Sequence, residues 1–150
     1  MERIRGLAEY IKNKDYREAL GLPQVQMEKY ELLAQGEYNI NYAFIHPVTG
    51  KKLLLRVNCG SQMHLEHQIE YEAHALRLME GSGRTPKVLY VDGSKKILEH
   101  GVLVMEYLPG HAMDYHTELM LAAPCLADIH SVPVPESEEI LIHPQNPLKA

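Results

Sequence analysis

Residues 62–80 read QMHLEHQIEYEAHALRLME, and this stretch decides how the rest of the chain is interpreted. Leu65, Ile69, Leu76 and Met79 recur at helical spacing and predict a helix with one apolar stripe. Glu72 lies near the centre of that stripe, where the pattern asks for an apolar side chain. A carboxylate on a core-facing stripe is costly to desolvate unless a cation or several donors meet it there. The helix therefore predicts a positive partner that is buried or lines a cleft.

The best match for that partner is Arg56, in the stretch KLLLRV at residues 52–57. This apolar run predicts a strand, and Arg56 is a charge inside an element that is otherwise core. Two opposite charges in neighbouring apolar elements favour an ion pair between the strand and the helix. The alternative is that each side chain reaches solvent separately at an edge of its element.

The composition sets further bounds. The chain of 150 residues is long enough for one domain with a core, and its net charge of -5 disfavours nucleic-acid and membrane partners. Cys59 and Cys125 are far apart, which favours a reducing compartment over a disulfide framework. Residues 1–16 are unlike a signal peptide, and the uncharged residues 119–127 are too few to span a bilayer. We expect a cytoplasmic protein. His64 and His67 lack a third ligand at a fitting place, so no metal site is predicted.

The remaining elements follow from periodicity and turn signals. Helices are predicted at residues 2–20, before a break at Pro23, and at residues 115–130. Strands are predicted at residues 27–35, 38–45, 52–57, 87–91 and 101–108. Alternation in the second strand places Tyr38, Ile40, Tyr42 and Phe44 on one face. Three strands, a helix and two more strands predict an α+β fold, a five-stranded antiparallel sheet with one inserted helix.

Six stretches in this order carry a family resemblance: LAQGEYNINY (33–42), LLRV (54–57), EYEAHAL (70–76), TPKVLY (85–90), LVMEYLPG (103–110) and LADIHSV (126–132). Over residues 32–134 the chain resembles the aminoglycoside phosphotransferase and choline-kinase type of small-molecule kinase, which has a protein-kinase-like fold. The resemblance implies an N-terminal helical segment at 1–22 and a nucleotide-binding small lobe at 23–108. Residues 109–150 would form the hinge exit and the start of an incomplete large lobe.

The resemblance also implies site residues. Those of the phosphate-covering turn would be Gln35, Gly36, Glu37, Tyr38 and Asn39. Glycine there lets the backbone approach an anion, although a single glycine between two strands by itself predicts only a turn. Arg56 takes the place of the third-strand lysine that contacts the nucleotide phosphates, and Glu72 that of the helix acid that pairs with it. Met105 would line the back of the base pocket. The carbonyl of Glu106 and the N–H of Leu108 would hold the adenine ring.

The family's catalytic loop, H-G-D-x-x-x-x-N, is not found in these 150 residues. Its Asp accepts the proton of the substrate and its Asn helps to hold magnesium. His100 and Gly101 begin a similar string but are followed by Val102, ahead of the hinge. We therefore expect about half of such an enzyme, a truncated product or fragment that is inactive alone. No catalytic residue and no metal ligand is assigned within it.

Two functions stay open. The first is the nucleotide-binding half of a kinase that uses ATP or GTP with magnesium to phosphorylate a small-molecule hydroxyl. The second is a non-catalytic, kinase-derived module that binds a nucleotide or a partner. In either, the apolar Leu119, Leu121, Leu126 and Ile129 would be exposed, so self-association through their helix is expected. A domain without a nucleotide site would leave Arg56 and Glu72 unexplained. The resemblance leaves the acceptor open, because in such enzymes the large lobe recognises it.

Overall fold

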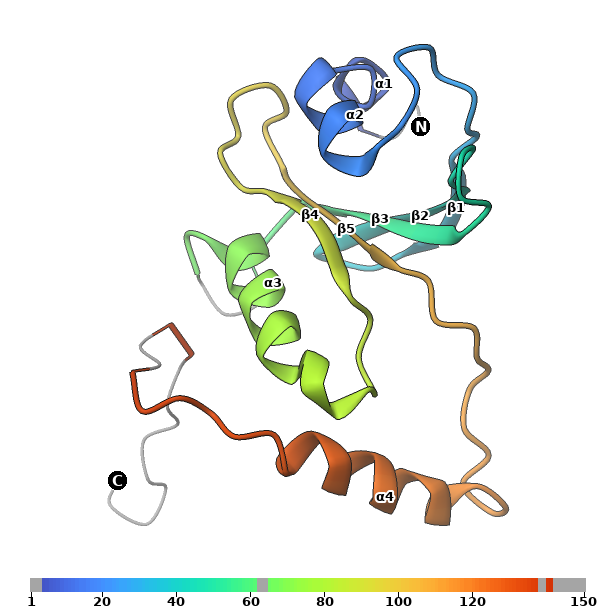
Figure 1. Cartoon of the computed structure of the whole chain (residues 1–150), viewed down its shortest axis with the longest axis vertical. Coiled ribbons are helices and arrows are strands. Elements are labelled where there is room, and N and C mark those ends of the chain that lie inside the picture. The colour runs from blue at the N-terminus through green and yellow to red at the C-terminus, as the bar shows by residue number, and fades with distance from the viewer. Residues whose placement is uncertain (1–3, 62–64, 138–139, 142–150) are drawn as a thin grey trace.

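The protein, described here by a computed structural model, has residues 4–61, 65–137 and 140–141 placed. One antiparallel sheet lies between two groups of helices (Figure 1). The strands are β1 (Glu31–Gln35), β2 (Asn39–Ile45), β3 (Lys52–Asn58), β4 (Val88–Asp92) and β5 (Gly101–Glu106). The helices are α1 (Leu7–Tyr10), α2 (Lys14–Leu20), α3 (Gln68–Met79), the short 3₁₀-helix η1 (Glu80–Ser82) and α4 (Leu119–His130).

The sheet has five strands in the order β1-β2-β3-β5-β4. Every neighbouring pair is antiparallel, and α3 is inserted between β3 and β4. This confirms the predicted α+β fold, a protein-kinase-like small lobe with one inserted helix. The position of α3 matters for function because it brings the helix against β5 and the edge strand β4, beside β3.

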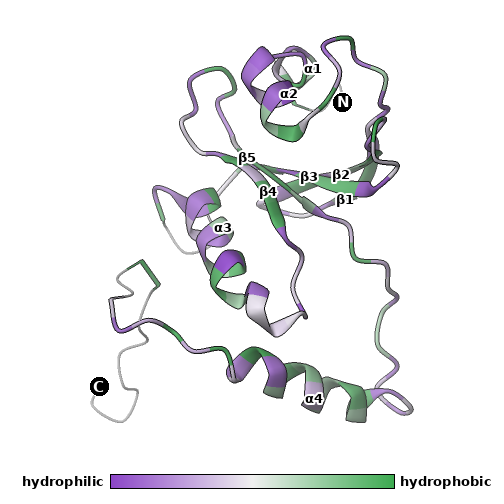
Figure 2. Ribbon diagram, viewed as in Figure 1, coloured by the Kyte–Doolittle hydropathy of each residue, from purple (hydrophilic) through white to green (hydrophobic). Residues whose placement is uncertain are grey.

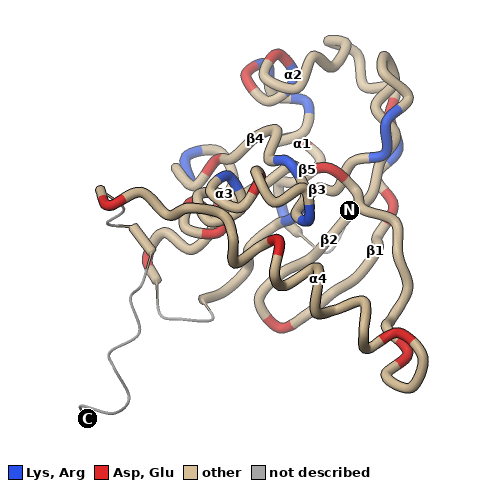
Figure 3. The backbone as a smooth tube through the Cα atoms, turned by 60° about the horizontal axis from the view of Figure 1, so that its bottom comes forward, with Lys and Arg blue, Asp and Glu red and all other residues tan. Residues whose placement is uncertain are grey.

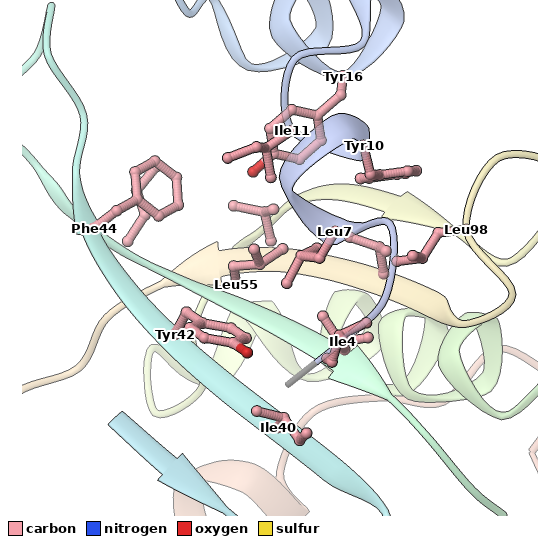
Figure 4. Close-up of a cluster of buried hydrophobic side chains, with 14 of the residues drawn as sticks. Ile4, Leu7, Tyr10, Ile11, Tyr16, Ile40, Tyr42, Phe44, Leu55 and Leu98 are labelled. Carbon is pink, nitrogen blue, oxygen red and sulfur yellow. The ribbon is translucent and has the colours of Figure 1, made fainter. Parts of the chain in front are cut away.

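The larger core lies on the sheet face opposite α3. Ile40, Tyr42 and Phe44 of β2 all point into it, as their alternation predicted. Side chains of the N-terminal helices pack on them, including Leu7 and Tyr10 (Figure 4). The N-terminal segment therefore shares one core with the sheet. The predicted divisions after residues 22 and 108 stay predictions.

A smaller core joins α3 to the other face of the sheet. Ile69 and Ala73 of α3 pack against Leu103 and Met105 of β5. The helix approaches closely because Gly101 has no side chain: a Cβ there would lie 2.6 Å from Cγ2 of Ile69. The glycine thus sets the distance between α3 and the sheet.

The predicted single helix at residues 2–20 is wrong. The structure has two short helices, because Asn13 caps the second one: its Oδ1 accepts a hydrogen bond from the N–H of Asp15 at 2.9 Å. The helix then ends at Gly21, which adopts a left-handed φ of 66°. The break predicted at Pro23 therefore comes slightly earlier.

Other element boundaries also differ from prediction. β1 begins at Glu31 instead of residue 27, and β5 ends at Glu106 instead of residue 108. α3 begins at Gln68; residues 65–67 precede the helix, and residues 62–64 lie outside the described part of the chain. α4 begins at Leu119, because residues 115–118 form turns.

In the described part of the chain, no helix has both the length and the apolarity needed to cross a membrane. Basic and acidic positions are interspersed along most of the chain (Figure 3).

Candidate functional site

The predicted ion pair between strand and helix is present. Nη1 of Arg56 on β3 donates a hydrogen bond to Oε1 of Glu72 on α3. The two side chains are 25% and 24% exposed, so neither escapes to solvent separately at an edge. The pair is therefore half-buried and remains accessible to a ligand. The unusual position of Glu72 on its helix is explained by this contact.

Asn41 holds the same guanidinium from a second side, which the sequence analysis missed. It lies directly opposite Arg56 on the neighbouring strand β2, and its Oδ1 accepts a hydrogen bond from Nε of Arg56 at 2.9 Å. The available signal was the alternation of β2, which places Asn41 on the face away from Tyr42. Among the described residues, no hydrogen bond uses Nη2 of Arg56.

The predicted phosphate-covering turn connects β1 to β2. The N–H of Gly36 donates to the carbonyl of Asn39 at 2.9 Å and closes a four-residue turn. Tyr38 and Asn39 are half-buried, whereas Gln35, Gly36 and Glu37 are exposed. A Cβ on Gly36 would meet only the carbonyl oxygen of Asn39, at 3.8 Å. The space around this glycine is therefore open.

The second half of this turn is fixed to the end of β3. The carbonyl of Tyr38 accepts a hydrogen bond from the N–H of Cys59 at 2.7 Å. Nδ2 of Asn58 donates to Oδ1 of Asn39 at 3.0 Å. Since Asn39 is only two positions before Asn41, these bonds place the turn next to the residues that hold Arg56.

A row of apolar side chains crosses the sheet beside Arg56. Ala43 pairs with Leu54, and Leu54 pairs with Met105, in the adjacent strands β2, β3 and β5. Leu54 is two residues from Arg56 and therefore lies on the same face of β3. Ala43 and Met105 are buried and Leu54 is half-buried, so a ring would meet this row chiefly at Leu54. Met105 was predicted; Ala43 and Leu54 were not, because their alignment depends on strand register.

A surface cavity of about 490 Å³ adjoins the end of this row. Ala43 and Lys52 contribute to its wall, and the cavity extends toward Pro47. Nζ of Lys52 also lies 4.1 Å from the ring centroid of Tyr107. None of the residues predicted for the nucleotide site lines this cavity. The candidate site therefore consists of the polar residues around Arg56, namely Glu72 and Asn41, and of the apolar row.

The stretch after β5 is the predicted hinge. The N–H of Glu106 donates to the carbonyl of Lys87 at 3.0 Å, and its side-chain Oε2 accepts from the N–H of Lys87 at 3.1 Å. Leu108 is 53% exposed, and its N–H takes part in no hydrogen bond within the described residues. The base contacts of Glu106 and Leu108 stay predictions.

In the described ranges 4–61, 65–137 and 140–141, no three His, Cys, Asp or Glu side chains are grouped so that they could hold an ion. His64, weighed as a ligand with His67, lies outside these ranges. The ring of His67 instead lies 3.7 Å from the carboxylate of Glu70.

A model of the phosphotransferase enzyme family matches residues 29–148. Among solved structures, the fold is similar to that of a Ralstonia eutropha JMP134 protein provisionally assigned as an aminoglycoside phosphotransferase. The TM-score is 0.50 at 14% sequence identity, and the match covers 73% of this chain and 29% of that one. No curated protein matches. Because the family model covers most of its length, this chain belongs to the phosphotransferase enzyme family.

Proposed function

We propose that this chain is the nucleotide-binding half of a small-molecule kinase, in which the γ-phosphoryl group of ATP or GTP passes to a hydroxyl. The observation that carries the proposal is Arg56: a guanidinium held on two sides by protein, with Nη2 left without a protein partner in the described structure. Family membership supports phosphoryl transfer in general. The residues around Arg56 support nucleotide binding by this chain.

The phosphates fit the polar end of the site. A planar guanidinium presents N–H donors in a fork that matches phosphate oxygens, and its charge persists at any physiological pH. The turn at Gly36 lies nearby, where small side-chain volume allows an anion to approach main-chain N–H groups. Arg56 and the turn would therefore position the phosphates together.

The base fits the apolar end. Ala43, Leu54 and Met105 are aligned across three strands, and the purine ring would lie against the half-buried Leu54, the most exposed of the three. The main chain of Glu106 and Leu108 follows directly after Met105 and would supply one acceptor and one donor to the ring edge.

Magnesium, when bound, neutralises charge on the β- and γ-phosphates. The proposal takes no metal ligand from the described residues. It also assigns none of them to the acceptor hydroxyl or to proton transfer, so the contribution of this chain is to bind and orient the nucleotide.

The test is a calorimetric titration of the 150-residue chain with Mg·ATP and Mg·GTP. We expect Arg56→Ala to weaken binding about 10- to 100-fold, because it removes charge-assisted hydrogen bonds to phosphate. Glu72→Gln should weaken it less, since Arg56 would keep its charge. Arg77→Ala is the matched control. Arg77 is on α3, the helix that carries Glu72, but its side chain is exposed and lies outside the site. Unchanged affinity in Arg56→Ala, with the fold verified by circular dichroism, would remove the phosphate role.

A second candidate is a non-catalytic, kinase-derived module that binds a partner. It is favoured by the exposed apolar surface of α4, where Met120 is 81% exposed. If the unaltered chain bound no nucleotide, this partner-binding function would be favoured over the first.

A further inference from the structure

We propose that Asn41 is a positioning residue that orients the guanidinium of Arg56 toward the nucleotide phosphates. This inference rests on the proposed function, but it adds a specific residue and a specific geometric role. Asn41 itself would not touch the nucleotide; it acts through Arg56.

The argument begins with the planarity of the guanidinium. One contact, from Nη1 of Arg56 to Oε1 of Glu72, fixes one corner of the group and leaves the plane free to rotate about that corner. The second contact, from Nε to Oδ1 of Asn41 at 2.9 Å, fixes another corner. Two anchored corners define the direction of the whole plane, and therefore that of Nη2.

The two anchors come from separate elements. Glu72 is on α3, whereas Asn41 is on β2, directly opposite Arg56 in the sheet. The position of Asn41 relative to Arg56 is therefore fixed by the strand register and does not depend on the exact placement of α3. Of the two, Asn41 is the anchor that a small movement of the helix would not displace.

The same contact explains why arginine suits this position. A lysine ammonium is a point donor at the end of a flexible stem and has no second nitrogen where Nε lies. With lysine at position 56, a single nitrogen would have to serve Glu72, Asn41 and the phosphate. Only arginine has a separate N–H donor for an asparagine acceptor beside the stem, so Asn41 and Arg56 form a functional unit.

A first measurement needs no nucleotide. In nitrogen-15 NMR spectra of the full chain, the Nε–H signal of Arg56 can be assigned by its loss in Arg56→Lys. We expect this proton to be protected from solvent exchange in the unaltered protein and to become rapidly exchanging in Asn41→Ala. An unchanged signal in Asn41→Ala would overturn the proposal.

The second measurement is binding of Mg·ATP and of adenosine by calorimetry. Asn41→Ala should weaken ATP about 3- to 10-fold, less than Arg56→Ala does, because the charge remains but its direction is lost. Adenosine has no phosphate, so its affinity for Asn41→Ala should lie within about twofold of its affinity for the unaltered protein. Asn13→Ala, the same substitution at the N-cap of α2 and away from the site, should leave both affinities unchanged.

A double-mutant cycle completes the test. In an Arg56→Lys background, Asn41→Ala should change ATP affinity by less than about twofold, since the lysine offers Asn41 nothing to orient. A full loss in that background would show that Asn41 acts elsewhere. Equal weakening of ATP and adenosine would indicate a general structural role. Either result overturns the proposal.

The two levels of proposal fail in different ways. If the unaltered chain binds no ATP, the proposed function fails and the phosphate role of Asn41 fails with it, while the NMR signal still reports whether Asn41 holds Arg56. If ATP binds normally to Asn41→Ala but weakly to Arg56→Ala, only the role of Asn41 is lost.

Discussion

Arg17 and Glu28 form an ion pair whose side chains are both 0% exposed. The two groups meet through two hydrogen bonds, of 2.8 and 3.1 Å. Arg17 also donates to the carbonyls of Ile11 and Pro23, and Glu28 accepts from the hydroxyl of Tyr30. These additional hydrogen bonds offset the cost of removing both charged groups from water. The pair fixes the chain between α2 and β1.

Removing one partner should therefore be costly. We expect Glu28→Gln to lower the free energy of unfolding by about 3–5 kcal/mol, because the Arg17 charge stays buried without its counter-ion. Glu18→Gln is the matched control, since Glu18 forms an exposed pair with Lys14 and should change stability by less than about 0.5 kcal/mol. Urea unfolding followed by circular dichroism measures both. Equal midpoints for the two variants would contradict the prediction.

The same pair gives a pH dependence. Burial alone raises the pKa of Glu28, but hydrogen bonds from Arg17 and from main-chain N–H groups more than offset it, so the pKa lies below the ordinary 4.5. A lowered folded-state pKa contributes stability that is present above the unfolded-state value and is lost as the pH falls through the folded-state value. We expect unfolding midpoints to fall as the pH drops below about 4.5 in the unaltered protein, and to fall less steeply in Glu28→Gln.

At the scale of elements, the contact between α3 and β5 controls the site. Gly101→Ala would place a Cβ 2.6 Å from Cγ2 of Ile69, so the helix must move. We expect a loss of about 1–3 kcal/mol in unfolding free energy, typical of an overpacked core. Because α3 carries Glu72, nucleotide affinity should fall as well. Gly81→Ala, at a glycine with no atom within 4 Å of the added Cβ, should affect neither. Thermal melts and calorimetry on both variants check this, and an unaffected Gly101→Ala would show that α3 does not need this close approach.

Some elements were readable from the sequence because local pattern and tertiary burial agree. The alternation of β2 directs Ile40 and Phe44 into the core, and the misplaced Glu72 correctly indicated Arg56. The break at Asn13 was missed because a helical apolar pattern continues across it, and only the side-chain cap reveals the end. Asn41 was missed because its role depends on strand register, which the pattern of one strand does not contain.

Start and end points of elements were less readable for a similar reason. The segment before β1 has strand-like composition, but the buried Arg17–Glu28 pair holds it in another conformation. A charge pair between a helix and the segment that follows it leaves no periodic signal. Local propensity therefore places an element, while contacts outside the element decide where it begins.

At the scale of the whole molecule, α4 is set apart from the sheet (Figure 1). Hydrophobic residues make up most of this helix (Figure 2), and the exposed fractions of Leu119, Leu121 and Leu126 are 53%, 66% and 53%. Ile129 is half-buried, so its predicted exposure is only partial. An ion pair of 2.7 Å between Arg84 and Asp128 links the helix to the loop before β4. That pair is exposed and fixes the position of α4 only weakly.

An apolar helix in this environment favours association of the chain with itself. Burying one large apolar side chain is worth about 1.5–3 kcal/mol, so the exposed leucines together with Met120 could offset much of the entropy cost of forming a dimer. We expect the weight-average mass, measured by light scattering after gel filtration, to rise with concentration from the monomer value of 17.1 kDa.

Met120→Glu should shift that rise to higher concentration, because the new carboxylate would have to be desolvated within the contact. Met27→Glu makes the same change at a methionine that is also exposed, at 67%, but belongs to the segment before β1 and not to α4. Its mass profile should match that of the unaltered chain if α4 is the contact. Equal shifts in the two variants would mean that added charge alone prevents association. A monomer at every concentration would mean that the α4 surface does not drive self-association.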